Sequence, residues 1–134
     1  MKPQKIFSSL FIVMILVGMS LTVQAQDAAK PTASITWKAT TIDLGKIEKG
    51  KPVSIDFEFT NPSMVPLIIN SVRPTCGCTV ADYTKEPVAP GKNGKITLTY
   101  NAASGGPFTK STIISSNSAD GNTTLVIKGE VVDK

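Results

Sequence analysis

The sequence predicts an all-β fold, an antiparallel two-sheet β-sandwich of about seven or eight strands. Beyond residue 25, fourteen Thr, ten Ile and eight Val stand against four Leu and one Met, a balance that favours strands over helices. Turn residues recur at intervals of about 8 to 12 residues, which is typical of a sandwich. No window combines an apolar stripe of helical period with a capping residue before it, which argues against a parallel βαβ architecture.

The clearest strand is predicted over Val53–Thr60, where apolar and polar residues alternate with period two. This alternation indicates one buried face and one solvated face. Ile35–Thr40 and Ile42–Ile47 are predicted as shorter strands before it. Pro66–Val72 and Thr79–Tyr83 follow it, each bounded by the Gly, Pro or Asn residues that interrupt regular structure. The large side chains available for a core are Trp37, Phe57, Phe59, Tyr100 and Phe108.

Three further strands complete the predicted sandwich. Lys95–Tyr100 alternates with period two, and Thr109–Ser116 and Thr123–Val132 are β-branched runs. The Asp120-Gly121 step between the last two runs can supply the left-handed residues of a hairpin connection. Gly105-Gly106-Pro107 is interpreted as a loop, because neither the context nor the Lys-Ser/Thr ending of a phosphate-binding loop is present.

The N-terminal residues 1–25 are predicted to be a cleaved signal peptide. Lys2 and Lys5 precede the uncharged, mainly apolar stretch Ile6–Val23, and Val23-Gln24-Ala25 has the small-x-small pattern of a cleavage site. The alternative is a retained membrane anchor, since about 18 apolar residues are near the minimum that spans a bilayer. Cleavage predicts a periplasmic or secreted protein without a stable membrane span, with a disordered lead-in over residues 26–34 and one folded domain over residues 35–132.

Composition excludes several functional classes. The chain has no histidine and only two cysteines, so it has neither Ser-His-Asp nor Cys-His catalysis and no His-ligated zinc. Removal of Lys2 and Lys5 lowers the formal net charge from +4 to +2, which is too small for a nucleic-acid surface. The sequence therefore predicts a protein that is not an enzyme, takes no cofactor and binds no nucleic acid.

Several segments resemble a bacterial family of exported immunoglobulin-like domains of unknown function, which is frequent in Bacteroidetes. The resemblance covers nearly all of the predicted domain, and its most specific part is the signature Thr75-Cys76-Gly77-Cys78-Thr79. It implies an immunoglobulin-like sandwich, similar to Hydin-type, major-sperm-protein and PapD-like domains, and an exported location. Relatives mostly act as binding or scaffolding modules. The segments that carry the resemblance are Asp43–Ile47, Phe57–Ser63, Pro66–Ile69, Pro74–Thr79 and Pro90-Gly91.

Cys76 and Cys78 are the candidate site residues, and in an exported protein an even cysteine count suggests a disulfide. On an extended strand the two Cα atoms would be about 6.7 Å apart, at the far limit for a disulfide. The backbone must therefore bend, and Gly77 permits a bend because it accepts positive φ. Closing a loop of three residues stabilises the fold by only about 1.6 kcal/mol.

Three interpretations of the pair stay open. Both cysteines can pack as small apolar residues or form an inert disulfide. A strained, exposed disulfide is more easily reduced, so Cys76 and Cys78 can also be a redox pair. If the segment stays extended, both sulfurs lie on one face and can hold Cu(I).

Other polar residues predict surface features rather than a site. Asn61-Pro62-Ser63 is interpreted as a turn, and Lys46, Lys49 and Lys51 as charges that protect an edge strand. The leading hypothesis is an exported, non-enzymatic binding or scaffolding module of the bacterial cell envelope, which takes up a strand of an unidentified envelope protein at a sheet edge. The alternative is a thiol protein that uses Cys76 and Cys78 for redox exchange or Cu(I) binding.

Overall fold

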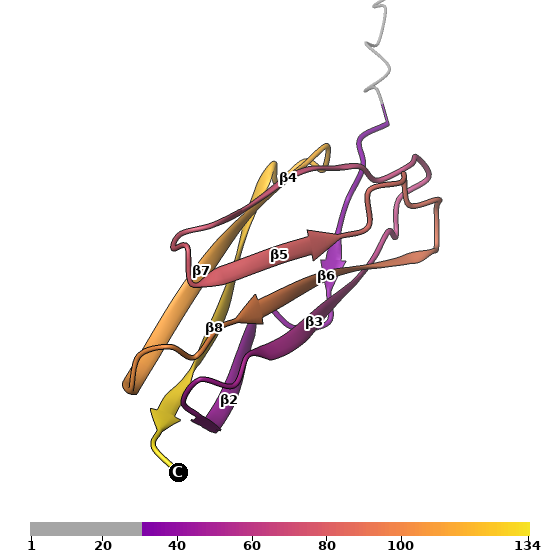
Figure 1. Cartoon of the computed structure of the whole chain (residues 1–134). Coiled ribbons are helices and arrows are strands. Elements are labelled where there is room, and N and C mark those ends of the chain that lie inside the picture. Colours follow the sequence, from indigo (N-terminus) through magenta and orange to yellow (C-terminus); the bar gives the residue numbers. More distant parts are fainter. Residues whose placement is uncertain (1–30) are drawn as a thin grey trace, which may run out of the picture.

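Two four-stranded sheets face each other in the computed structural model, which describes residues 31–134 (Figure 1). The first sheet has the order β1–β3–β6–β5, and the second has the order β2–β8–β7–β4. The predicted all-β sandwich is therefore confirmed. In chain order the strands are β1 (Thr36–Trp37), β2 (Thr41–Glu48), β3 (Val53–Thr60), β4 (Ile69–Pro74), β5 (Thr79–Tyr83), β6 (Asn93–Tyr100), β7 (Gly106–Ser116) and β8 (Asn122–Val132).

The strand order agrees with an immunoglobulin-like topology, in which one sheet joins strands A, B, E and D and the other joins C, F and G. All paired strands are antiparallel except β2 and β8, which run parallel. This parallel pair departs from the purely antiparallel expectation. It arises because the chain leaves the first sheet after β1 and continues in the second sheet, beside its last strand.

The largest differences from the predicted strand bounds occur at three places. The first strand is two residues long rather than six. The strand predicted over Pro66–Val72 begins at Ile69 and ends at Pro74, because Leu67 forms an isolated bridge with Val88 instead. Gly106 and Pro107, interpreted as part of a loop, belong to β7, since the long strand β8 provides partners for them.

The folded part also begins earlier than residue 35. Ala33 is buried, forms an isolated parallel bridge with Ser118, and accepts a hydrogen bond from the N–H of Ala119 (3.0 Å). The predicted disordered lead-in is thus wrong at Ala33, because this small side chain fits under the β7–β8 connection. The remainder of that prediction over residues 26–30 and the predicted signal peptide, residues 1–25, lie outside the described residues. No helix long and apolar enough to cross a membrane occurs within residues 31–134.

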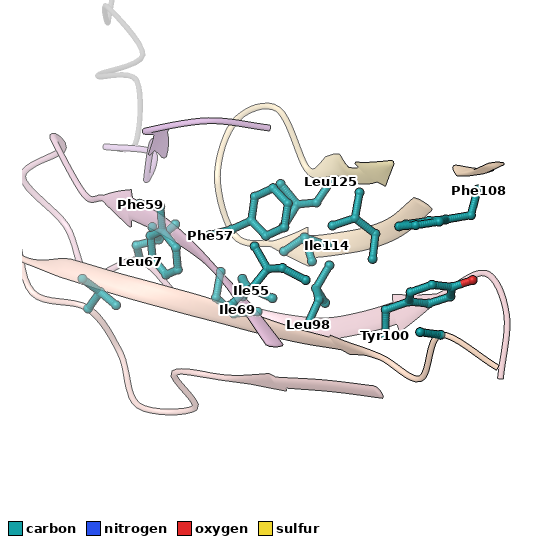
Figure 2. Close-up of a cluster of buried hydrophobic side chains, with 14 of the residues drawn as sticks. Ile55, Phe57, Phe59, Leu67, Ile69, Leu98, Tyr100, Phe108, Ile114 and Leu125 are labelled. Carbon is teal, nitrogen blue, oxygen red and sulfur yellow. The ribbon is translucent and has the colours of Figure 1, made fainter. Parts of the chain in front are cut away.

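The core lies between the sheets and uses the predicted aromatic residues (Figure 2). Phe57 and Phe59 are buried, and Trp37 is tilted against Phe59 with ring centroids 5.2 Å apart. Tyr100 and Phe108, from opposite sheets, stack at 4.4 Å. The Tyr100–Phe108 contact therefore joins the two sheets, whereas Trp37 and Phe59 pack together within the first sheet.

Asn61 lies at one end of the sandwich, at a position where the sequence predicts a plain turn. Its side chain is fully buried and donates to the carbonyl oxygens of Val65 (2.8 Å) and Val88 (2.9 Å). Its Oδ1 accepts hydrogen bonds from the backbone N–H and the hydroxyl of Ser63. The turn is therefore tied to the connection between β5 and β6.

Candidate functional site

The Cys76-Gly77-Cys78 segment lies in the connection between β4 and β5, which are edge strands of opposite sheets. The connection crosses from the second sheet to the first at one open side of the sandwich (Figure 1). Both strands approach the segment as regular extended structure, but the segment itself is a turn. It therefore marks the point where two unpartnered sheet edges meet.

Hydrogen bonds to neighbouring strands hold both ends of this turn. On the β4 side, the N–H and the hydroxyl of Thr75 both donate to the carbonyl of Ser111, at 3.0 and 2.9 Å. On the β5 side, the carbonyl of Cys78 accepts from the N–H of Asn101 (3.0 Å). These anchors use no sulfur atom, so the turn is positioned by β7 and by the end of β6.

The two sulfurs are joined in a disulfide, and the Cα atoms of Cys76 and Cys78 are 5.3 Å apart, well inside the usual range. The expected bend is present, but its predicted origin is wrong. Gly77 does not have positive φ; the bend is a turn in which the Thr79 N–H approaches the Cys76 carbonyl at 3.4 Å. A Cβ on Gly77 would meet no atom within 4 Å.

The surroundings of the two sulfurs differ. Both cysteines are partly exposed, but Cys78 packs against the hydrophobic core while Cys76 does not. The backbone N–H of Cys78 donates to Sγ of Cys76 at 3.3 Å. Arg73 is the one charged residue between Ile69 and Ala81, and it is exposed. Cys76 is thus the sulfur with the hydrogen-bond donor and the less apolar surroundings.

The geometry assumed for Cu(I) binding is not present. That arrangement required an extended segment with both sulfurs on one face, whereas the segment is bent and its sulfurs are bonded to each other. Within residues 31–134, no group of three or more His, Cys, Asp or Glu residues is close enough to hold a metal ion. Met64, whose thioether is also a soft donor, is exposed on the β3–β4 connection.

The four edge strands differ in how they are protected against further pairing. The strand β1 has only two residues. The strand β2 has a register irregularity between Asp43 and Lys46, and lysines follow it, as expected. The strand β4 has an irregularity after Ile69 and ends at Pro74. Shortness, bulges, lysine and proline all discourage edge pairing.

The strand β5 itself contains none of these features, although Lys85 follows it and lies over the ring of Tyr83. Its five residues pair with β6 in continuous register, and they include no proline and no lysine. Because Cys78 and Thr84 bond with β6, alternation directs the backbone groups of Ala81 away from it. Asp82 partly closes this side, since its carboxylate accepts from the N–H of Tyr83 (2.9 Å). The side chain of Val80 is 68% exposed beside the edge.

Two carboxylates, Asp56 and Glu58, lie on the exposed outer face of β3. Asp56 accepts a hydrogen bond from the hydroxyl of Thr97 (2.6 Å), which lowers the pKa of Asp56 together with the nearby ammonium of Lys95. Glu58 pairs with Lys38 at 2.8 Å, and this hydrogen bond raises the pKa of Lys38. Each carboxylate is therefore engaged with a neighbour on an exposed surface.

The charges near the end of β2 are also paired. Glu48 forms ion pairs with Lys51 and with Lys134, and these hydrogen bonds lower the pKa of Glu48. Lys49 approaches Asp133 at 3.6 Å. These ion pairs connect the end of β2 to the residues after β8, so charged side chains surround the end of this edge strand.

The sequence matches the model of one protein family, described as "Protein of unknown function (DUF1573)", over residues 35–131. The chain belongs to this family. The match spans nearly the whole sandwich of this DUF1573 domain, which includes the Cys-Gly-Cys turn. No curated protein matches the sequence.

Solved structures support the fold of the DUF1573 domain. A protein of unknown function from Porphyromonas gingivalis W83 is similar with a TM-score of 0.68 and 19% identity; the match covers 82% of this chain and 51% of that one. The chain therefore spans about half the length of that protein. The ASH/PapD-like domain 7 of human CEP192 is similar with a TM-score of 0.61 and 11% identity, over 87% of this chain and 98% of that domain.

A third similar structure is the Vibrio cholerae VesB protease, with a TM-score of 0.62 and 17% identity, over 72% of this chain and 32% of the protease. Identities this low show a shared fold alone. The PapD-like neighbour agrees with the immunoglobulin-like sandwich that the resemblance implied.

Two features of the site were not identified in the sequence. The strand Thr79–Tyr83 was predicted with its observed bounds, but its position at an unprotected edge depends on the strand order. The hydrogen bond from the Cys78 N–H to the Cys76 sulfur depends on the shape of the turn. One residue gave a local indication of the open edge. Val80, two positions after Cys78, is an exposed apolar residue on the same face of β5 as Asp82.

Proposed function

We propose that this domain is an exported, non-enzymatic binding or scaffolding module of the bacterial cell envelope, and that it takes up a partner strand at β5. The observation that carries the proposal is the difference between the four edge strands within residues 31–134: β1 has only two residues and β2 and β4 have register irregularities, whereas β5 has five residues in continuous register without proline or lysine. Added strands pair through backbone hydrogen bonds and gain specificity from alternate side chains. The unprotected edge of β5 provides the backbone groups for these hydrogen bonds.

The side chains on the outer face of β5 can provide the specificity. Val80 is an exposed apolar residue, and Asp82 two positions later offers a carboxylate on the same face. A partner strand would place one apolar and one basic or hydrogen-bonding side chain opposite them. Pairing with Ala81 would use its outward N–H and carbonyl, whereas the Tyr83 N–H must first leave the Asp82 carboxylate.

The arrangement of carboxylates supports a non-enzymatic role. Asp56 and Glu58 lie two apart on one strand, where each is engaged with its own neighbour. Acid–base catalysis generally uses groups whose pKa is moved toward neutrality, and the pKa of Asp56 is moved away from it. The chain has no histidine to take that role.

Site-specific photo-crosslinking tests the strand-addition proposal. A photoreactive phenylalanine analogue replaces Val80 in the full-length protein, produced in a bacterium that carries this gene. We expect one protein adduct at Val80 and none when the same analogue replaces Thr41 on the protected edge β2. Absence of an adduct at Val80, or equal adducts at both positions, would contradict the proposal.

A backbone variant shows whether the adduct depends on strand pairing. Ala81→Pro removes the outward N–H and leaves the hydrogen bonds to β6 intact, because those are made by the residues before and after it. The Val80 adduct should disappear in this variant. Ala81→Ser is the matched control, because it changes the same position and keeps its backbone N–H; the Val80 adduct should persist in it.

A second candidate function is thiol chemistry at Cys76 and Cys78. One observation favours it: both cysteines of the bonded pair are partly exposed. Substitution of both by Ser separates the two candidates. Adduct formation at Val80 should survive the double substitution if the module binds through β5, and any thiol function should be lost.

A further inference from the structure

We infer that the Cys76–Cys78 pair is a thiol–disulfide exchange site in which Cys76 forms the mixed disulfide with the substrate and Cys78 resolves it. The substrate class is thiols and disulfides of other exported proteins. This inference rests on the second candidate function and names its substrate and the order of its steps. Three features of the turn support it.

The first feature is that the fold does not depend on the bridge. The Thr75 and Cys78 backbones are held by Ser111 and Asn101, and neither contact involves sulfur. The bridge closes a loop of only three residues, so it restricts the unfolded chain little. A pair that is positioned by hydrogen bonds in both redox states can cycle without unfolding the domain.

The second feature distinguishes the two sulfurs. The Cys78 N–H points at Sγ of Cys76, and a hydrogen bond to the charged form stabilises a thiolate. The Cys78 side chain packs against the hydrophobic core, which disfavours its thiolate. Cys76 is therefore the better nucleophile of the reduced pair and the sulfur that a substrate reaches.

The third feature is access. Gly77 is exposed, and a Cβ on it would meet no atom within 4 Å outside Cys76 and Cys78. Both cysteines are partly exposed, and the edge strand β5 begins at the next residue, Thr79. A substrate segment that carries a cysteine can therefore reach the turn from solvent.

The exchange balances without a further reactant. In the reduced form, the Cys76 thiolate attacks a substrate disulfide, forms a Cys76–substrate disulfide and releases one substrate thiolate. Cys78 then loses its proton to solvent and attacks Sγ of Cys76, which releases the second thiolate. Two electrons pass from the pair to the substrate, and the released thiolates take up two protons. The reverse sequence oxidises two substrate thiols and reduces the pair.

The first test asks whether the pair exchanges at all. The full-length protein is produced with its own N-terminal segment and purified with the disulfide formed, then mixed with a reduced synthetic peptide that holds two cysteines. We expect two peptide thiols to be lost for each protein molecule, by alkylation and mass spectrometry. We also expect the reduced protein to keep its β-sheet circular dichroism. A pair that stays oxidised, or a protein that unfolds on reduction, would overturn both the inference and the second candidate function.

The second test addresses the order of the steps alone. Cys78→Ser leaves the Cys76 thiol, and Cys76→Ser leaves the Cys78 thiol. At pH 7 we expect iodoacetamide to modify the Cys78→Ser variant roughly tenfold faster, because the backbone N–H of residue 78 stabilises the Cys76 thiolate. The peptide should be trapped as a mixed disulfide on Cys76 in that variant. Equal or reversed rates would overturn the assignment of Cys76 while leaving exchange itself established by the first test.

Discussion

The side-chain amide of Asn61 donates a hydrogen bond to the carbonyl of Val88 at 2.9 Å, and this contact joins two connections at one end of the sandwich. A second hydrogen bond from the same nitrogen reaches the carbonyl of Val65. Asn61 is fully buried, and each carbonyl accepts a second hydrogen bond, from the Leu67 N–H to Val88 and from the Ser63 hydroxyl to Val65. Asn61 thus stabilises the path of the chain that leads from β3 to β4.

Asn61→Ala is expected to lower the free energy of unfolding by about 2 kcal/mol, because it removes the two hydrogen bonds that the buried amide donates to Val65 and Val88. Urea denaturation followed by tryptophan fluorescence measures this difference. Asn70→Ala, at an exposed asparagine of β4, is the control and should stay within about 0.5 kcal/mol of the original protein. A similar loss in both variants would contradict the role of Asn61.

Gly129 and Gly77 predict opposite results for the same Gly→Ala change. A Cβ on Gly129 would lie 2.6 Å from the Gly45 carbonyl oxygen and 3.0 Å from the Phe108 ring, so Gly129→Ala should lower stability by about 1–3 kcal/mol. Gly77 has open space and no positive φ, so Gly77→Ala should be neutral or raise stability by up to about 1 kcal/mol. Thermal unfolding of the two variants tests this difference.

Thr79→Val is expected to raise the free energy of unfolding by about 1 kcal/mol, since the substitution removes a desolvated hydroxyl and keeps the side-chain shape. The hydroxyl of Thr79 is buried and has no hydrogen-bond partner among residues 31–134. Thr75→Val is the contrasting variant, because the Thr75 hydroxyl donates to Ser111. Chemical denaturation should show a gain for Thr79→Val and a small loss for Thr75→Val; two losses would count against this account.

Stability should be nearly constant between about pH 5 and pH 10 and should fall outside this window. The pKa values of Asp56 and Glu48 lie below their usual 3.8 and 4.5, so their contributions are present above those values and are lost as the pH falls through the lowered ones. The pKa of Lys38 lies above 10.5, so its contribution is lost as the pH rises through the raised value. Denaturation midpoints across pH 2–12 measure the profile.

One variant tests how much of the loss of stability at low pH is due to Asp56. Thr97→Val removes the hydrogen bond that contributes most to lowering the pKa of Asp56. Its stability should be lower than that of the original protein at pH 7, and the difference should shrink in strong acid, where Asp56 is protonated in both. A difference that does not change with pH would show that Thr97 acts independently of the Asp56 charge.

Local patterns in the sequence were enough to predict individual strands. Alternation over Val53–Thr60 predicted β3 with its observed bounds, and the turn residues on either side of Thr79–Tyr83 did the same for β5. The Cys-Gly-Cys spacing also showed that a disulfide requires a bend. Period-two patterning and turn residues are local properties of the chain, so they can be read without knowing which strands pair.

Other features depend on pairing between distant segments, and only the folded structure shows them. The parallel pairing of β2 with β8 and the unprotected edge at β5 follow from the strand order, which no local pattern encodes. Asn61 was predicted as a turn residue, and its hydrogen bond to the Val88 carbonyl, 27 residues later, is visible only in the structure. The difference between Cys76 and Cys78 likewise arises from a turn anchored by β7 and by the end of β6. Such contacts require closure of long loops, so only the complete fold brings their partners together.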